Sequence, residues 1–431
     1  MKTRRISLRT FVAVQLLVTA AFAVSYAGLS HESEERLQAA LTGHEVVSNI
    51  PVERVKPLCI DPLYDDPEVV SDEQLAAVLE KILPRFSPKE LKPNFVEHAL
   101  RTWGVEATFD DPRAISGIAL RDVLIDHGHF LQSWNEETVP LLVDRPEGIS
   151  IRYDRTSGGS VHHDHWLASL TEAGISRDEP VFAPARRDMT INDVLQEAAR
   201  DFRLDERETE WSAMAFGLWL PPVKTWRTAD GRQISFDLLA QRLLRGHKRF
   251  GVCSGTHRVY SMMVLLRLDD DFDILSDATY DTVYAHLESV RDAIVASQLE
   301  DGSWPSNWPS GADAAANPLD EAVYKKVIAT GHHLEWLAIA PKELHPPHEQ
   351  ILKAADWAIN HTVERPESGI RKQYTFYSHV GKALALWRGT QPAHFWREWR
   401  KAHPYEPTKT DAAEAGRSTG SDLPTDSPSN H

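Results

Sequence analysis

Apolar positions recur along this chain with a helical period, and longer apolar segments recur at near-constant intervals. Within residues 94–104 and 191–203, apolar residues return every three to four positions, which is the spacing that predicts amphipathic helices. The longer apolar segments start 46, 46, 76 and 46 residues apart, at His165, Trp211, His257, His333 and His379. A period in the forties is typical of one supersecondary unit stacked against copies of itself.

Two classes of helix are predicted to alternate. Six segments are apolar on most faces and are expected to be enclosed: 94–104, 163–174, 208–220, 255–267, 324–340 and 372–388. Six others have one charged face and are expected to meet water: 73–84, 116–127, 191–203, 236–246, 278–299 and 348–361. Short loops favour antiparallel pairs. The sequence therefore predicts an all-α fold, an (α/α)6 toroid of six helical hairpins.

The remaining segments set the expected domain boundaries. Residues 149–153 alternate apolar and polar side chains ahead of a Gly-rich turn, which predicts a small β-hairpin insertion. The end of the chain is rich in Ser, Thr, Pro and Asp, which predicts disorder. The expected units are a signal peptide or membrane anchor at 1–30, a linker at 31–70, the toroid domain at 71–400 with its hairpin at 148–161, and a disordered tail at 401–431.

The first 30 residues differ in character from the rest of the chain. Four basic residues, Lys2, Arg4, Arg5 and Arg9, precede the uncharged and largely apolar residues 11–28. This order predicts either a cleaved export signal or a transmembrane anchor, and the length fits both. In either case we expect the main body outside the cytoplasm, in the cell envelope or secreted, with membrane contact through this segment alone.

Charge and cysteine content narrow the classes of partner. The net charge of −16 would repel phosphates and argues against a nucleic-acid partner. The two cysteines, Cys59 and Cys253, are able to pair in an oxidising compartment or to stay unpaired as small buried residues.

Residues 296–304 contain a motif with a family resemblance. Gln298 is followed by Asp301, Gly302, Ser303 and Trp304. This pattern resembles the QW motif of squalene and hopene cyclases, in the terpenoid cyclase and protein prenyltransferase toroid superfamily. The resemblance covers residues 285–390, and 94–284 only through helix periodicity. It implies a toroid fold, in which the motif ties neighbouring hairpins together; it carries over no chemistry, because the Asp-x-Asp-Asp acid of the class II cyclases is absent.

Polar residues gather where several of the enclosed helices are expected to begin. In a toroid these helices are parallel, so their N-termini would open at one end of the ring. The residues expected at this mouth are His162, His163, Asp164, His165, Trp211, Cys253, Thr256, His257, His332, His333, Glu335, Tyr377 and His379.

Three interpretations of the mouth residues remain. In the first they cap helix ends and pack. In the second Cys253 and His257, four residues apart across a helix start, bind zinc. Protein prenyltransferases and lanthionine synthetases, which are toroids, are similar in placing Cys and His ligands at the mouth. In the third the imidazole of His163 or His257 transfers protons, oriented by Asp164 or Glu335.

Aromatic side chains suggest what such a site would bind. Trp residues in loops and at helix starts are suited to stack on a sugar ring or an isoprenoid. The candidate ligand-binding residues are His165, Trp211, Trp304, Trp308, His333, Tyr377 and His379. The sequence supports an exported or anchored toroid that binds, and in one hypothesis processes, a glycan or isoprenoid-type ligand. A non-catalytic scaffold and a zinc-dependent toroid enzyme are the alternatives.

Overall fold

The computed structural model describes residues 8–28, 37, 41, 50–135, 137–154, 158–245 and 253–405. These residues are mostly helical, and their strands form only three two-stranded antiparallel sheets, which confirms the prediction of an all-α fold. Parts of four expected segments lie outside the described residues: the two ends of the signal segment, linker residues 31–36, 38–40 and 42–49, the turn at 155–157 and the tail beyond 405.

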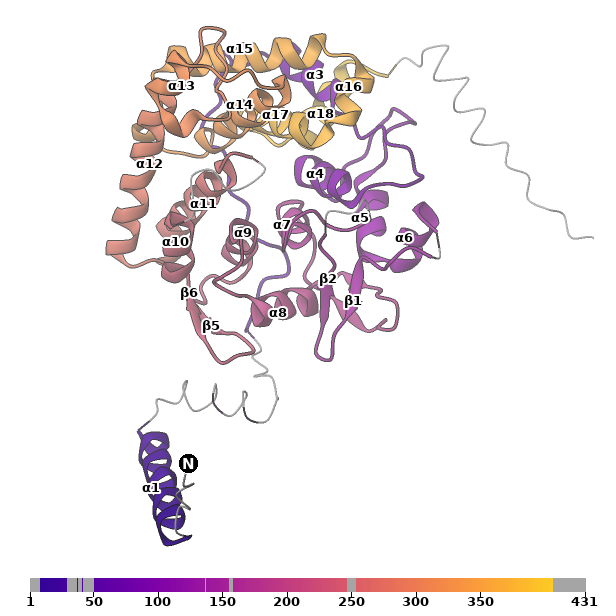
Figure 1. Cartoon of the computed structure of the whole chain (residues 1–431). Coiled ribbons are helices and arrows are strands. Elements are labelled where there is room, and N and C mark those ends of the chain that lie inside the picture. The colour runs from indigo at the N-terminus through magenta and orange to yellow at the C-terminus, as the bar shows by residue number, and fades with distance from the viewer. Residues whose placement is uncertain are drawn as a thin grey trace, which may run out of the picture.

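Six helices within the described ranges are enclosed, and we call them the inner helices. They are α4 (Pro93–Trp103), α7 (His165–Glu172), α9 (Glu210–Trp219), α11 (Thr256–Phe272), α14 (Val323–Leu337) and α17 (Tyr374–Trp387). Every residue of α9 is buried, which is the pattern of a helix surrounded by protein. Each inner helix packs against the next in chain order, and α17 packs against α4, so the contacts return to their start (Figure 1).

Six amphipathic helices lie against the inner helices or their connections. They are α3 (Asp72–Lys81), α5 (Gly117–Ile125), α8 (Ile191–Asp201), α10 (Phe236–Leu244), α12 (Asp277–Ser297) and α15 (His348–Glu364). Helix α12 buries Val283, Leu287, Val290 and Ile294, which follow one another at four, three and four residues. This is one stripe of an α-helix, and the opposite face meets water.

The shorter elements connect these helices. The helices are α6 (His127–Ser133), η1 (Trp308–Ser310), α13 (Ala312–Ala316), η2 (Lys342–Leu344), α16 (Glu367–Lys372) and α18 (Pro392–Ala402). The strands are β1 (Leu142–Asp144), β2 (Ile149–Ile151), β3 (Pro180–Val181), β4 (Met189–Thr190), β5 (Thr225–Arg227) and β6 (Gln233–Ser235). The hairpin expected at 148–161 is displaced, because β2 pairs with β1 upstream and residues 153 and 160 form only an isolated bridge.

Helix α1 (Leu8–Ala27) covers the apolar N-terminal stretch. No helix in the described part of the chain is both long and apolar enough to cross a membrane. The transmembrane helix expected at residues 11–28 is therefore wrong. Polar Gln15, Thr19 and Ser25 interrupt the apolar run, and 20 residues leave no length to spare against the ~20 that a bilayer core requires.

An extended segment, residues 50–66, crosses the C-terminal ends of the inner helices, and we call it the strap. Its amides donate to main-chain carbonyls at these ends, at 2.8, 3.2 and 2.8 Å, in the pairs Leu58 with Leu218, Leu63 with Ala338, and Asp66 with Trp387. Carbonyls in the last turn of a helix have no partner within the helix. The strap supplies donors to three of them, so this part of the expected linker is bound to the helical domain.

The QW-like motif ties α12 to α15. The Gln298 amide donates to the carbonyls of Gly302, at 2.9 Å, and Gln350, at 2.7 Å. The fully buried Trp304 donates to the carbonyl of Ile294 at 2.9 Å. Gly302 has a φ of +90°, and a Cβ there would lie 2.5 Å from the carbonyl oxygen of Lys353. These contacts hold the end of α12 against α15.

Candidate metal centre

Each inner helix contributes one aromatic side chain to a closed layer at the centre of the domain. In chain order these residues, which we call the aromatic layer, are His98, His165, Trp211, His257, His332 and His379. Neighbouring ring centroids are 4.8, 4.3, 4.2, 4.2 and 3.8 Å apart in that order, and 5.2 Å separates the last from the first. Five imidazoles from five helices thus share one layer.

The imidazoles of the aromatic layer are buried and uncharged at neutral pH. Their side chains come from residues at most 7% exposed. Loss of hydration disfavours the charged form, so burial lowers the pKa of all five imidazoles below the ordinary value. Neutral imidazole is the form that binds metal ions.

Four nitrogens of the layer are buried without a hydrogen-bond partner among the described residues. They are Nε2 of His165, Nδ1 of His257, Nε2 of His332 and Nε2 of His379. Buried polar atoms in proteins are nearly always satisfied, and an unpartnered one requires an explanation such as an ion, a water or a ligand. Four in one layer make the layer a candidate site for such a group.

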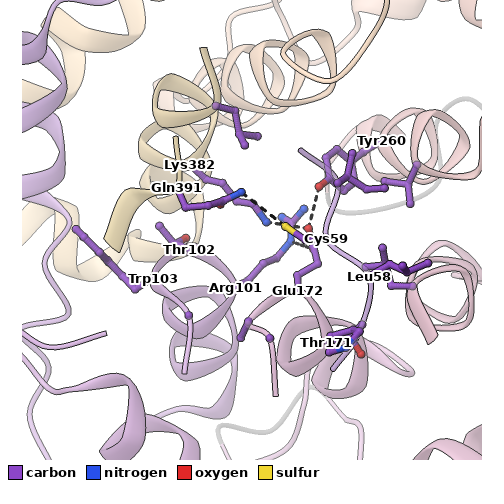
Figure 2. A pocket seen from close by; sticks show the side chains of 18 residues that line it. Leu58, Cys59, Arg101, Thr102, Trp103, Thr171, Glu172, Tyr260, Lys382 and Gln391 are labelled. Carbon is purple, nitrogen blue, oxygen red and sulfur yellow. Dashed lines mark hydrogen bonds and ion pairs between the residues drawn. The ribbon is translucent and has the colours of Figure 1, made fainter. Parts of the chain in front are cut away.

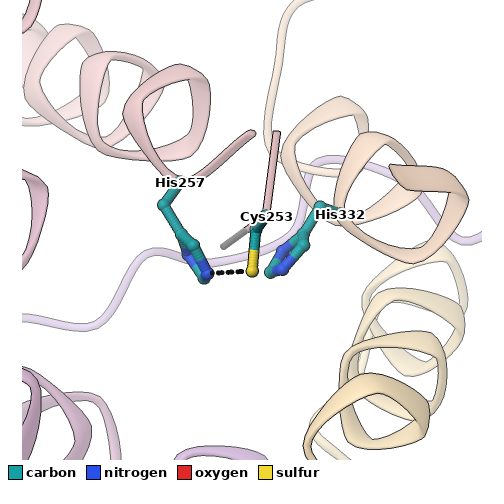
Figure 3. A group of neighbouring side chains, drawn as sticks. All are labelled: Cys253, His257 and His332. Carbon is teal, nitrogen blue, oxygen red and sulfur yellow. Dashed lines mark hydrogen bonds between the residues drawn. The ribbon is translucent and has the colours of Figure 1, made fainter. Parts of the chain in front are cut away.

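Cys253 brings a thiol to one side of the layer. Its Sγ lies 3.0 Å from Nε2 of His257, and the donor atoms of Cys253, His257 and His332 all lie within 4.8 Å of one another (Figure 3). The turn before α11 places the thiol there, because Ser254 and Gly255 have φ values of +56° and +83° and direct the chain back over the helix start. Cys253 is unpaired, as is the exposed Cys59, so no disulfide joins them.

Glu335 orients the histidines from the other side. Its Oε2 lies 3.2 Å from Nδ1 of His332 and 3.0 Å from Nδ1 of His379. A carboxylate only accepts, so Nδ1 of His332 carries the proton and its Nε2 presents a lone pair. Burial would raise the pKa of Glu335, yet the Arg101 cation and the hydrogen bond from His332 lower it to about 2. A carboxylate behind a histidine is the usual support of a metal-ligating imidazole.

Arg101 occupies the position where a second cation would otherwise bind. The donor atoms of His332, Glu335 and His379 also lie within 4.8 Å of one another. Arg101 Nη2 is 3.0 Å from Oε1 of Glu335, however, and Nη1 is 2.9 Å from Nδ1 of His379. Since this buried guanidinium already neutralises the carboxylate, the cysteine side of the layer is the better site for an ion.

A carboxylic acid adjoins the layer at His165. Oε2 of Glu97 is 2.5 Å from Nδ1 of His165, and both side chains are fully buried. Burial raises the pKa of Glu97 to about 8. Near neutral pH the Glu97 carboxyl is therefore protonated and the His165 imidazole beside it is uncharged.

This raised pKa predicts a measurable pH dependence. In the metal-free protein the unfolded Glu97 carboxyl, with an ordinary pKa of about 4.3, is ionised at pH 7. The folded form keeps its proton until about pH 8, so the folded state binds more protons and the free energy of unfolding falls as pH rises. Glu97→Gln is expected to remove this contribution, which is on the order of 1 kcal/mol per pH unit between about pH 7 and 8. Urea unfolding in the presence of a chelator measures it.

Glu106→Gln is the control for this measurement, because the Glu106 side chain is 84% exposed and only weakly paired. It should keep the wild-type slope. Equal slopes in wild type and Glu97→Gln would contradict the protonation state assigned to the pair.

Two sequence-predicted catalytic residues lie beside the aromatic layer, in a separate ionic group. Nδ1 of His163 is 3.3 Å from Oδ2 of Asp164 and 3.2 Å from Oε2 of Glu206. Burial opposes protonation, but the two carboxylates raise the pKa of His163 to about 11. A permanently charged imidazole is a poor general base at neutral pH.

Four predicted ligand-binding residues are not brought into the layer. His333 packs against Trp304 and Trp308, with ring centroids 5.4 and 4.7 Å away, and accepts from the indole of Trp336. Tyr377 stacks on His361 on the other side of its helix. Consecutive residues of an α-helix are rotated by about 100° about its axis, so His332 points into the aromatic layer and His333 points away from it.

Neither His98 nor Arg101 is among the residues predicted from the sequence, and His332 is predicted at the mouth whereas His333 is predicted to bind the ligand. His98 lies in the first predicted enclosed helix. It is 67 residues before His165, which does not match the 46-residue period, so the period does not identify it. Comparison with known proteins adds no assignment. No family model matches the chain, and neither the curated proteins nor the solved structures include a match.

Proposed function

We propose that this chain is a zinc protein built on an (α/α)6 toroid, with the ion bound at its centre by Cys253, His257 and His332. The toroid is supported by the cycle of contacts among the inner helices and by the amphipathic helices that cover them. The zinc site rests on one observation. A thiol and an imidazole at the start of α11 meet an imidazole of α14 in a buried layer, where Nε2 of His332 has no other partner among the described residues.

Zinc suits these ligands better than other common ions. Thiolate and imidazole nitrogen are its usual protein ligands, and donor atoms about 3.3–3.8 Å apart surround it in a tetrahedral site. The separations among Cys253, His257 and His332 are compatible with this after small side-chain movements. Calcium and magnesium prefer oxygen ligands, whereas Cys253, His257 and His332 offer sulfur and nitrogen.

Three protein ligands leave one position of a tetrahedral ion for water or substrate, which is the arrangement of catalytic zinc sites. A bound water would lose a proton near neutral pH and become a nucleophile. We therefore propose a zinc-dependent enzyme that adds water to its substrate. A glycan or isoprenoid is less well supported, because the buried side chains of the aromatic layer occupy the centre of the domain.

A structural zinc site is the second candidate, and His379 favours it. The His379 ring is 3.8 Å from that of His332, and its Nε2 has no partner in the described part of the chain. As a fourth ligand it would close the coordination sphere, and the ion would then only stabilise the fold.

Metal analysis of the purified full-length chain tests the proposal. We expect about one zinc per chain, and a cobalt-substituted protein with a thiolate-to-metal charge-transfer band and the intense visible absorption of a tetrahedral site. A chain that retains neither metal overturns the proposal. In His379→Ala, an unchanged cobalt spectrum supports the open catalytic site, and a changed one supports the structural site.

A further inference from the structure

A cavity lies beneath the strap, at the C-terminal ends of α4 and α7. It has a volume of about 200 Å³ (Figure 2). One wall is formed by strap residues 57–60, and the opposite surface by the last turns of α4 and α7 together with Tyr260 and Lys382. Arg101 lies between this cavity and the aromatic layer, because it lines the cavity and also contacts His379 and Glu335. This cavity is therefore separate from the candidate metal ligands.

The polar surface of the cavity centres on a buried ammonium group. Nζ of Lys382 donates to Oε1 of Glu172 at 2.8 Å, and its side chain is 6% exposed. Tyr260 donates to the same oxygen at 2.8 Å, and Arg101 pairs with the other. An ammonium has three N–H donors, and no second acceptor for it is found among the described residues. Lys382 therefore has donors left for a group in the cavity.

The rest of the lining is largely apolar. Its larger apolar side chains are Leu58, Ile60, Trp103, Leu218, Val264 and Leu386. The buried charges balance, because Arg101 and Lys382 face Glu172 and Glu335. Because the charges of the cluster balance, a ligand need not be charged. A molecule that fits this cavity would be largely apolar and would carry one hydrogen-bond acceptor.

We propose that this cavity is a binding site for a small apolar molecule that ends in a carboxylate or an amide, with the acceptor oxygen on Lys382. The apolar body would lie against Trp103, Leu58 and Leu386. The proposal does not depend on bound zinc. The competing explanation is a group of about six waters, at ~30 Å³ each.

Calorimetric titration of the full chain with benzoate, benzamide and benzylamine tests the site. Benzoate or benzamide is expected to bind with a Kd of about 1 mM or tighter, which corresponds to about −4 kcal/mol. Benzylamine presents an ammonium to Lys382 and should bind at least about tenfold more weakly. The stronger of the first two probes tells whether the natural acceptor is charged or neutral. If neither binds, or if benzylamine binds equally well, the cavity holds only water and the proposal is wrong.

Two strap variants locate the binding. Leu58→Trp fills the cavity and should abolish binding, whereas Leu63→Trp changes a 44% exposed leucine on the same strap and should preserve it. Lys382→Met should weaken binding at least about tenfold, with circular dichroism as the check on folding. Binding that survives Leu58→Trp would place the probe elsewhere and overturn the assignment.

Discussion

His332→Gln is expected to lose zinc, and His333→Gln, one residue further along the same helix, is expected to keep it. His332 presents a free Nε2 to Cys253 and His257, while its Nδ1 is bound to Glu335. Replacing a residue that only supports a ligand costs about 10–100-fold in metal affinity, so the loss of a ligand itself should exceed about 100-fold. Competition with a chromogenic chelator measures the affinity, and elemental analysis gives the stoichiometry.

His333→Gln is the control, because it makes the same substitution at an equally buried histidine. Both histidines are at most 1% exposed, so damage to folding should be similar in the two variants. His333 makes its hydrogen bond to Trp336, and glutamine retains an acceptor there. Equal loss of zinc in both variants would show that the effect arises from misfolding or that the ion binds elsewhere. Retention of zinc in His332→Gln would remove this residue from the site.

Arg101→Met is expected to lower the free energy of unfolding by about 3–5 kcal/mol, measured by urea denaturation of the zinc-free protein at 25 °C. Arg101 is 3% exposed and pairs with Glu172 and Glu335, which are themselves buried. Removing the cation leaves two carboxylates that have lost their hydration and their principal partner. The cost is the penalty of these uncompensated charges and not the strength of the ion pair itself.

Two further variants isolate this cause. Arg203→Met removes a pair with Asp205 whose side chains are 73% and 75% exposed, and its effect on the free energy of unfolding should be much smaller, because water screens an exposed ion pair. Adding Glu172→Gln and Glu335→Gln to Arg101→Met removes the stranded charges and should recover much of the loss. If Arg101→Met is no more damaging than Arg203→Met, the buried network does not stabilise the fold as argued.

The helices were predictable because the spacing of apolar residues within one segment indicates which of its faces is buried. The enclosed segment predicted at 94–104 is α4 (Pro93–Trp103), and that predicted at 372–388 is α17 (Tyr374–Trp387). Whether a helix is apolar on one face or on most faces depends only on the residues within that helix. The N-terminal helix shows where such reasoning fails, since its length near the spanning limit suggested a transmembrane helix that the structure does not support.

The candidate site was predictable in part. The 46-residue period indicated that His165, Trp211, His257 and His379 would share a location, and these four side chains lie in the aromatic layer. The same period selected His333, because a repeat of this length does not resolve one residue. A shift of one position turns a side chain by about 100° and moves it from the centre of the domain to its outer layer.

Local sequence patterns are enough to predict alternating enclosed and amphipathic helices and the recurrence of histidines along them. Which side chains come into contact depends on the packing of the helices against one another. Cys253 and His332 are 79 residues apart, and Arg101 reaches His379 across 278. Those meetings depend on how each helix is rotated about its axis and on which helices are neighbours. Both are set by packing between distant segments, and no local pattern of residues records them.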